Sequence, residues 1–372
     1  MRIKYILAIL MLCILSITGC KGKDIETMAP ILPVETPLPS PSPTAPPEPT
    51  PEPGPDLTGK RPSALTGEWI DEEIAARRPV AVVINNRLIA LPQSGISQAG
   101  AIYEVLSEGD ITRLVAVFDN FDSQKIGPVR STRDYFIDFA LDHDALFVHH
   151  GGSETGYAAL RRLNIDRIDG MTDARAFWRD QKRANSPGMY EHSSYTGMEI
   201  LLEEFERKNA RTDKYEDFTT GWAFYPIEAL PLGGMPATKI TVPFSRNYTA
   251  VFRYDPEEKI YYKCIGFAQE PQIDEETGEQ LKVTNVLVQH AKMHVIAGDT
   301  EGRRNVTTVG QGDGYLFTGG ECVPVTWKKE SQQSPTRWYD EQGNLLRLNI
   351  GKTWICVHQG EITFEGEEQV IE

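Results

Sequence analysis

Residues 79–86 read Pro-Val-Ala-Val-Val-Ile-Asn-Asn, a continuous apolar run that ends in polar side chains. A run of this length without alternation is typical of a strand that is buried on both faces of a sheet. Asn85, Asn86 and Arg87 close the run, and polar groups at the end of a buried strand often carry function. We therefore expect a central strand with polar side chains at its carboxyl end.

The segments that follow this strand alternate between strands and helices. Residues 101–108 and 111–119 flank Gly109-Asp110, a pair that is typical of a two-residue hairpin turn. Another buried strand is predicted over residues 145–150. Three helices have capping signals: 131–141 with Ser131 as the cap and Asp134 in the first turn, 153–163 with Ser153 as the cap, and one from Thr196 with Glu199 at the reciprocal position. This alternation predicts an α/β domain with a mixed sheet over residues 69–231.

After residue 236 the helix signals give way to short strand-like runs that are separated by turn signals. The runs are 239–244, 249–254, 259–265, 283–296, 305–309, 314–317, 322–328 and 354–358. They predict a mostly antiparallel β domain over residues 236–365, so the expected fold class is α+β. The glycine-rich Gly310-Gln311-Gly312-Asp313-Gly314 has no helix after it, so we predict a turn there and not a phosphate-binding loop.

The N-terminus has the features of a lipoprotein signal peptide. Two basic residues precede an apolar core over residues 6–17, which is too short to span a bilayer comfortably. The core ends in Ile17-Thr18-Gly19-Cys20, which resembles the site that lipoprotein signal peptidase cleaves. We predict a signal peptide over residues 1–19 and lipid attachment, including palmitate, at Cys20 on the extracytoplasmic side of the cell membrane. An uncleaved signal anchor is the alternative.

Residues 20–68 are predicted to be a tether, and residues 366–372 a solvated acidic tail. Thirteen of the 25 prolines lie between Pro30 and Pro62, which is typical of a polyproline II chain. The formal net charge of the 372-residue chain is −15, so its surface repels nucleic acid and does not favour flat adhesion to anionic lipid. The lipid bilayer is therefore an expected partner through the anchor alone, and nucleic acid is not an expected partner.

Cysteine and tryptophan positions favour packing roles. Cys264, Cys322 and Cys356 include no Cys-x-x-Cys pair, so we predict buried thiols, with at most one disulfide, and no zinc or redox site. Trp327 and Trp354 fall within predicted strands and are expected in the β core. No spacing indicates a metal or cofactor, and none is expected.

Seven motifs are spread over the body of the chain. They are Pro92-Gln93-Ser94-Gly95, Ala101-Ile102-Tyr103-Glu104, 108–113, 126–133, 149–153, Thr326-Trp327-Lys328-Lys329 and 351–355. Together they resemble the YerB lipoprotein family, which is a domain family of unknown function. The resemblance extends from about residue 79 to residue 357. It implies a surface lipoprotein with an α/β domain followed by a β domain, and it implies no established reaction.

Three arginines are candidates for an anion-binding site. Arg130 and Arg133 lie at the start of the helix predicted from Ser131, where free N–H groups and a partial positive charge attract anions. Arg113 on the hairpin and Asn86 at the end of the first strand are predicted to join them. The alternative is that Arg130 and Arg133 pair with carboxylates and pin the hairpin to the helix. The carboxylates in question are Glu104, Glu108 and Asp134.

The candidates for acid–base chemistry are His150, His192 and Glu108. His149 and His150 point to opposite faces of a strand, so both are not expected in one site. A histidine with a carboxylate such as Glu154 or Glu191 is a possible general acid–base set. A packed or capping histidine is the alternative at each position.

Two functions follow from these patterns, and the sequence leaves open whether the protein is an enzyme. The first is a lipoprotein that binds an anionic cell-envelope ligand or a partner protein. The second is an envelope hydrolase or transferase that acts on a phosphorylated or glycan polymer. Convergence of Arg113, Arg130, Arg133 and a histidine in one open cleft, without a nucleophile or an acid–base pair, would favour the first. Scattered side chains that pair with one another would support neither function at these residues.

Overall fold

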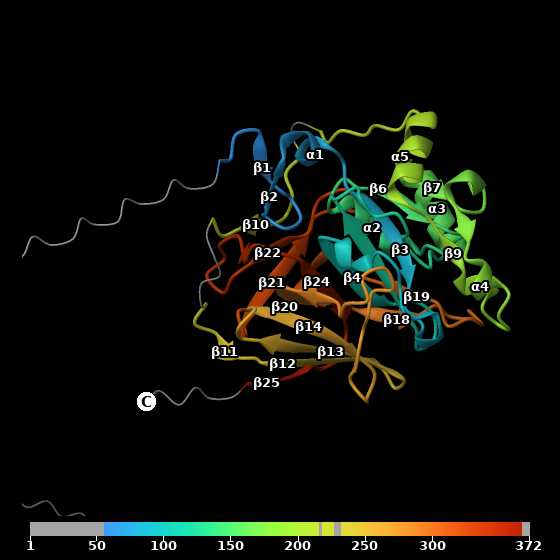
Figure 1. The fold of residues 1–372 in the computed structure, drawn as a ribbon. Helices are drawn as coiled ribbons and strands as arrows, with labels where there is room; N and C mark the ends of the chain where they lie inside the picture. The colour runs from blue at the N-terminus through green and yellow to red at the C-terminus, as the bar shows by residue number, and fades with distance from the viewer. Residues whose placement is uncertain (1–55, 216–217, 227–231, 367–372) are drawn as a thin grey trace, which may run out of the picture. The chain divides into compact units, whose positions relative to one another are not determined.

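Two β-sheets form the framework of the fold (Figure 1). The computed structural model describes residues 56–215, 218–226 and 232–366. Within these residues the larger sheet has 11 strands and the smaller sheet has six. The predicted signal peptide, Cys20 and the tether up to residue 55 lie outside the described residues, as do residues 367–372 of the predicted tail.

The larger sheet is mixed. In spatial order its strands are β11 (Met235–Pro236), β21 (Glu321–Lys329), β20 (Gly310–Thr318), β17 (Asn285–His290), β24 (Thr353–His358), β4 (Ala101–Leu106), β5 (Thr112–Phe118), β3 (Val80–Asn85), β6 (Leu146–His149) and β7 (Arg167–Asp169), with β22 (Arg337–Tyr339) on β21. Strand β3 is antiparallel to β5 and parallel to β6, and all its residues are buried. The apolar run is therefore the covered strand that was predicted, and β4 and β5 form the predicted hairpin.

Strand β24 joins the two halves of the larger sheet. It is parallel to β17 on one side and to β4 on the other. Among the described residues every helix ends at or before Arg207 and only strands follow, which confirms the α+β class there. The division into domains over 69–231 and 236–365 stays a prediction, because strands from both parts belong to one sheet.

The smaller sheet is antiparallel. Its strands are β15 (Glu270–Pro271), β14 (Ile260–Ile265), β13 (Tyr248–Asp255), β12 (Lys239–Ser245) and β25 (Thr363–Glu365), with β16 (Lys282–Val283) on β14. The other strands in the described part of the chain form four two-stranded sheets: β1 (Lys60–Pro62) with β2 (Trp69–Asp71), β8 (Trp178–Arg179) with β9 (Ser194–Tyr195), β10 (Ala223–Phe224) with β23 (Arg347–Leu348), and β18 (Met293–Val295) with β19 (Arg304–Val306).

The helices are short. They are α1 (Glu72–Ala76), α2 (Asp134–Leu141), α3 (Glu154–Leu163), α4 (Gln181–Ala184) and α5 (Met198–Arg207), with the 3₁₀ turns η1 (Leu88–Ala90), η2 (Ile96–Gln98), η3 (Ala174–Ala176) and η4 (Tyr190–His192). The predicted cap of α3 is confirmed, because Ser153 Oγ accepts a hydrogen bond from Gly156 N at 3.0 Å.

Two predicted helix starts are wrong. Helix α2 begins at Asp134 with Arg133 at the cap position, because the Ser131 hydroxyl instead donates to the His150 carbonyl at 3.1 Å. Helix α5 begins at Met198, because Thr196 Oγ1 donates to the Ala176 carbonyl at 2.7 Å. In both places a tertiary hydrogen bond takes the hydroxyl that the local pattern assigned to a cap.

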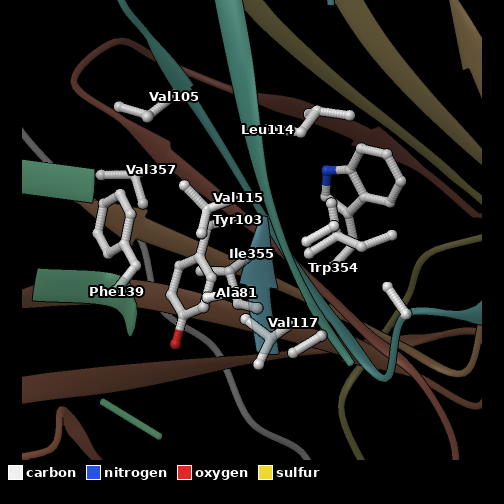
Figure 2. Packing of buried hydrophobic residues seen from close by; sticks show 14 of the residues in the cluster. Ala81, Tyr103, Val105, Leu114, Val115, Val117, Phe139, Trp354, Ile355 and Val357 are labelled. Atoms are coloured by element: carbon white, nitrogen blue, oxygen red, sulfur yellow. The ribbon is translucent and has the colours of Figure 1, made fainter. Parts of the chain in front are cut away.

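Aromatic side chains cover both faces of the larger sheet. Figure 2 shows Tyr103 and Phe139 on one side of the strands and Trp354 on the other. Tyr103 stacks on Phe139 of α2 with ring centroids 4.6 Å apart, and Trp354 meets Phe252 of the smaller sheet at 5.8 Å. Aromatic pairs of this kind contribute roughly 1 kcal/mol beyond the area that they bury. The larger sheet therefore lies between α2 and the smaller sheet.

Two further predictions need correction. The Gly310–Gly314 segment is not a turn, because it is the first half of β20 and pairs with β21. A Cβ atom at Gly314 would lie 2.3 Å from the Val288 carbonyl, so the glycine lets neighbouring strands approach closely. The predicted tether ends before residue 68, because residues 60–62 form β1 and Leu65 is buried in the core. The three described cysteines are buried and free, and Trp327 and Trp354 are in the core as predicted.

Candidate functional site

The candidate site lies at the carboxyl ends of β3 and β6, beside the turn of the β4–β5 hairpin. The backbone of Arg130 bridges the two strand ends: its N–H donates to Val83 O at 2.9 Å, and its carbonyl accepts from His150 N at 3.0 Å. Neighbouring parallel strands place their carboxyl ends at one edge of a sheet, where ligands commonly bind. The fold therefore brings segments near residues 85, 130 and 150 together.

A carboxylate between two buried arginines forms the inner part of the site. Glu108, at the hairpin turn, pairs through one oxygen with Arg113 and through the other with Arg133 at 2.5 Å. Both guanidiniums are buried, and each also donates to a backbone carbonyl, Arg113 to Ser131 O at 2.9 Å and Arg133 to Thr132 O at 2.7 Å. Glu108 therefore pins the hairpin to the segment that leads into α2, which is the alternative that the sequence left open for Arg133 but does not apply to Arg130.

The inner part has an excess of positive charge. Burial, together with the nearby Arg133 guanidinium, lowers the pKa of Arg113 to about 9, although Glu108 acts in the opposite direction. Burial opposes ionisation of Glu108, but Arg113 and Arg133 outweigh it and hold the pKa of this carboxyl below its ordinary value. At neutral pH two cations therefore face one anion.

Arg130 and Arg87 share a second carboxylate at the surface. Arg130 Nη2 lies 3.2 Å from Glu191 Oε2, and Arg87 Nη1 lies 3.8 Å from Glu191 Oε1. The Glu191 side chain is 54% exposed and Arg87 is also exposed. Arg130 Nε is buried without a hydrogen-bond partner among the described residues. We call Arg87 and Arg130 the surface arginine pair. Glu191 is the carboxylate that they share.

The two candidate histidines have separate partners. His150 Nδ1 lies 2.7 Å from Ser194 Oγ, while His192 Nδ1 accepts a hydrogen bond from Asn85 Nδ2 at 2.6 Å. Among the described residues no hydrogen bond or ion pair joins His150, His192 and Glu108. Ser194 is 2% exposed, so this hydroxyl is not presented to a substrate. The hydrolase or transferase alternative stays a hypothesis.

The surroundings of both histidines favour the neutral form of the imidazole. Burial, assisted by Arg179, lowers the pKa of His150, and burial, assisted by Arg130, lowers the pKa of His192. Each imidazole is therefore mainly neutral at pH 7. The glycine at position 170 leaves room for one of them, because a Cβ there would lie 2.4 Å from His150 Nδ1. The positive charge of the site comes from the arginines.

Asn86 does not join the arginines. Its side-chain amide donates to Glu104 Oε1 at 2.9 Å, to Thr112 Oγ1 at 2.8 Å and to the Tyr248 hydroxyl at 2.6 Å, all in the buried interior. Strand alternation explains the difference, since Asn85 and Asn86 point to opposite faces of the sheet. Asn85 is the member of this pair that reaches the candidate site, through His192.

Sequence reasoning named Arg87 at the end of the first strand but did not include it in the anion site, and it considered Glu191 only as a partner of a histidine. The structure does bring His192 Nε2 to 3.5 Å from Glu191 Oε1. Arg87 lies two residues after the end of the buried strand β3, so its position was a usable signal. Glu191 lies on η4, 61 residues from Arg130, and no local pattern predicts that pairing. Within residues 56–215, 218–226 and 232–366 no group of three or more His, Cys, Asp or Glu side chains is arranged to hold a metal ion.

Comparison with known proteins places the chain in a family. The N-terminal domain of the family described as "Protein of unknown function (DUF3048)" matches residues 65–211, and its C-terminal domain matches residues 240–355. The protein called "Putative lipoprotein YerB" of Bacillus subtilis is 32% identical over 305 residues, which cover 82% of this chain and 88% of that protein. The chain belongs to this YerB-like DUF3048 family.

A solved structure supports the fold of this YerB-like chain. The crystal structure of YerB protein from Bacillus subtilis matches it with a TM-score of 0.69 at 29% identity, over 82% of this chain and 100% of that chain. The resemblance that the seven motifs indicated is confirmed. None of the helices in the part of the YerB-like chain that the structure describes has the length and apolar character needed to span a membrane.

Proposed function

We propose that this YerB-like protein is held at the extracytoplasmic face of the cell membrane by lipid on Cys20, and that it binds an anionic ligand of the cell envelope through Arg87 and Arg130. The Ile17-Thr18-Gly19-Cys20 sequence and the lipoprotein name of the Bacillus relative support the anchor. One acyl chain gives marginal attachment, so a stable anchor needs at least two chains on the new N-terminal residue.

The observation that carries the binding proposal is the position of the Glu191 carboxylate. It lies 3.2 and 3.8 Å from two guanidiniums and 3.5 Å from His192 Nε2, on a side chain that is 54% exposed. A phosphate, sulfate or carboxylate of a ligand would make the same charge-assisted hydrogen bonds, and planar guanidiniums suit such oxyanions well. Glu191 thus marks the place where an anion would be held.

The buried arginines behind this pair support the same reading. Arg113 and Arg133 carry two positive charges against the single charge of Glu108, and Arg113 is electrostatically coupled to Arg130. This local excess stands out in a chain whose formal net charge is −15. A local positive potential on an acidic protein attracts anions to one place and leaves the rest of the surface repulsive to them.

The test is the retention of the full-length protein, in a non-ionic detergent, on immobilised poly(glycerol phosphate), with uncharged dextran as the reference matrix. Arg130→Gln and Arg87→Gln should each reduce retention severalfold and lower its dependence on salt. Arg337→Gln is the matched control, because Arg337 is exposed on β22 at another edge of the larger sheet. Equal retention of Arg130→Gln, Arg337→Gln and the unchanged protein would exclude the site.

A further inference from the structure

A cavity adjoins the surface arginine pair. It has a volume of about 290 Å³ and lies between the segment that follows β3, the turn of the β4–β5 hairpin and the start of β13. Its lining includes Arg87, Leu88 and Ile89 from the first segment, Ile111 from the turn, and Tyr248 from β13. This volume is close to the lower end for small-molecule pockets, so it suits part of a chain better than a whole lipid.

The walls of this cavity are apolar, because the polar atoms of its lining residues are occupied elsewhere. The Tyr248 hydroxyl accepts from Asn86, and Thr112 Oγ1 donates to Glu104 at 3.1 Å inside the protein. At the rim, Asn247 Nδ2 donates to Asp110 Oδ2 at 3.0 Å. The carbon atoms of these side chains therefore remain available to contact a molecule that enters the cavity.

Apolar side chains at the rim of the cavity are exposed to solvent. Leu88 is 54% exposed and Ile89 is 52% exposed, on the single turn of η1. Two neighbouring aliphatic residues beside a cavity form a patch that an apolar group can cover. Burial of such a group would remove apolar surface from water on both partners.

Arg87 links the cavity to the anion site. It lines the cavity, and its Nη1 lies 3.8 Å from the Glu191 carboxylate that Arg130 also binds. A cationic group at the mouth of an apolar cavity is complementary to a molecule with an anionic head and an aliphatic chain. A purely polar anion would leave the cavity and the Leu88–Ile89 patch unused.

We infer that the ligand is an anionic amphiphile: the phosphate of an envelope lipid lies on Arg87 and Arg130, and the first part of its alkyl chain enters the cavity beneath Leu88 and Ile89. The inference rests on the proposed anion site and specifies its ligand class. Affinity should then depend on the length of the ligand's alkyl chain as well as on its charge.

The experiment is a calorimetric titration of the full-length protein in a non-ionic detergent with methyl, butyl and hexyl phosphate, after subtraction of titrations into micelles alone. Each methylene that enters the cavity should tighten binding about fourfold until the cavity is filled. The Leu88→Asn and Ile89→Asn double variant should bind methyl phosphate as before but lose the gain with chain length. Leu345→Asn is the matched control, since Leu345 is 45% exposed and does not line this cavity.

The outcomes separate the two proposals. If all three phosphates bind the unchanged protein with equal affinity, binding of the alkyl chain in the cavity is excluded, while the proposed anion site is retained. If none of them binds, the anion site fails as well. Retention of the full chain-length gain in the Leu88→Asn and Ile89→Asn variant would place the alkyl chain elsewhere and overturn the inference.

Discussion

Lys263 Nζ lies 3.9 Å from Glu104 Oε2, and neither side chain reaches solvent. Lys263 donates to the Cys264 carbonyl at 3.0 Å, and its ammonium lies about 5 Å from the ring centroids of Phe252 and Trp354. Glu104 accepts from Asn86, Thr112 and the Trp354 indole N–H. This buried pair connects the larger sheet to the smaller one, because Glu104 is on β4 and Lys263 is on β14.

Removal of one partner of this pair should be costly. Lys263→Met leaves the Glu104 charge buried without its cation, and we expect the free energy of unfolding to fall by about 3–5 kcal/mol. Adding Glu104→Gln to Lys263→Met should recover much of this loss, because the double variant has no buried charge at the pair. Urea unfolding monitored by far-UV circular dichroism measures both. Lys282→Met, at an exposed ion pair with Glu258, is the control and should change little. A Lys263→Met protein as stable as this control would contradict the prediction.

His143 should make the protein sensitive to acid. Burial lowers the pKa of His143 to about 4, although Asp142 partly offsets it. A histidine in the unfolded chain titrates near pH 6.5, so between these values the unfolded state binds more protons. The contribution of His143 to stability is therefore complete above about pH 6.5 and is lost as the pH falls to about 4.

The variant that tests this is His143→Leu, which removes the titrating group. The loss of unfolding free energy between pH 7 and pH 4.5 should be about 2 kcal/mol smaller than in the unchanged protein. Tyr103 loses a 2.9 Å hydrogen bond to His143 in this variant but keeps Asp142 within 3.3 Å. Urea titrations at the two pH values give the difference. An identical pH dependence in both proteins would show that His143 does not control acid stability.

Glu191 should compete with the ligand for the surface arginine pair. Glu191→Gln removes the carboxylate that Arg87 and Arg130 share, so the protein should be retained severalfold more strongly on immobilised poly(glycerol phosphate). This increase in retention is opposite in sign to the decrease expected for Arg130→Gln. A variant that only impaired folding would not increase retention, so the two variants together distinguish a binding role from a folding defect. Glu203→Gln is the control, because Glu203 is exposed on α5. Weaker retention of Glu191→Gln would mean that the carboxylate positions the arginines for the ligand.

Cys20 should be required for membrane attachment. The Cys20→Ser protein should leave the membrane fraction and should lack the mass of the attached lipid, because no thiol is available for the diacylglyceryl group. Membrane fractionation followed by intact mass spectrometry measures both properties. If Cys20→Ser protein stayed in the membrane fraction with its mass otherwise unchanged, residues 1–19 would act as an uncleaved anchor.

Several local elements were predictable, because short-range chemistry determines them. The β3 strand follows from its unbroken apolar run, and the β4–β5 hairpin follows from Gly109-Asp110 between two apolar segments. The Ser153 cap likewise depends on a backbone N–H only three residues away. The Ser131 and Thr196 caps failed for the converse reason, since their hydroxyls bond to carbonyls that other elements bring close.

The amino-acid sequence by itself therefore determined the family, the α+β class and the presence of an arginine-rich segment at residues 130–133. Tertiary structure alone decided which arginines are buried on Glu108 and which share Glu191 at the surface, and it placed Asn86 in the interior with Tyr248. The physical reason is that strand period and turn chemistry act over a few residues. The partner of a charged side chain depends instead on how segments such as β4 and β24, whose Glu104 and Trp354 are 250 residues apart, pack into one sheet.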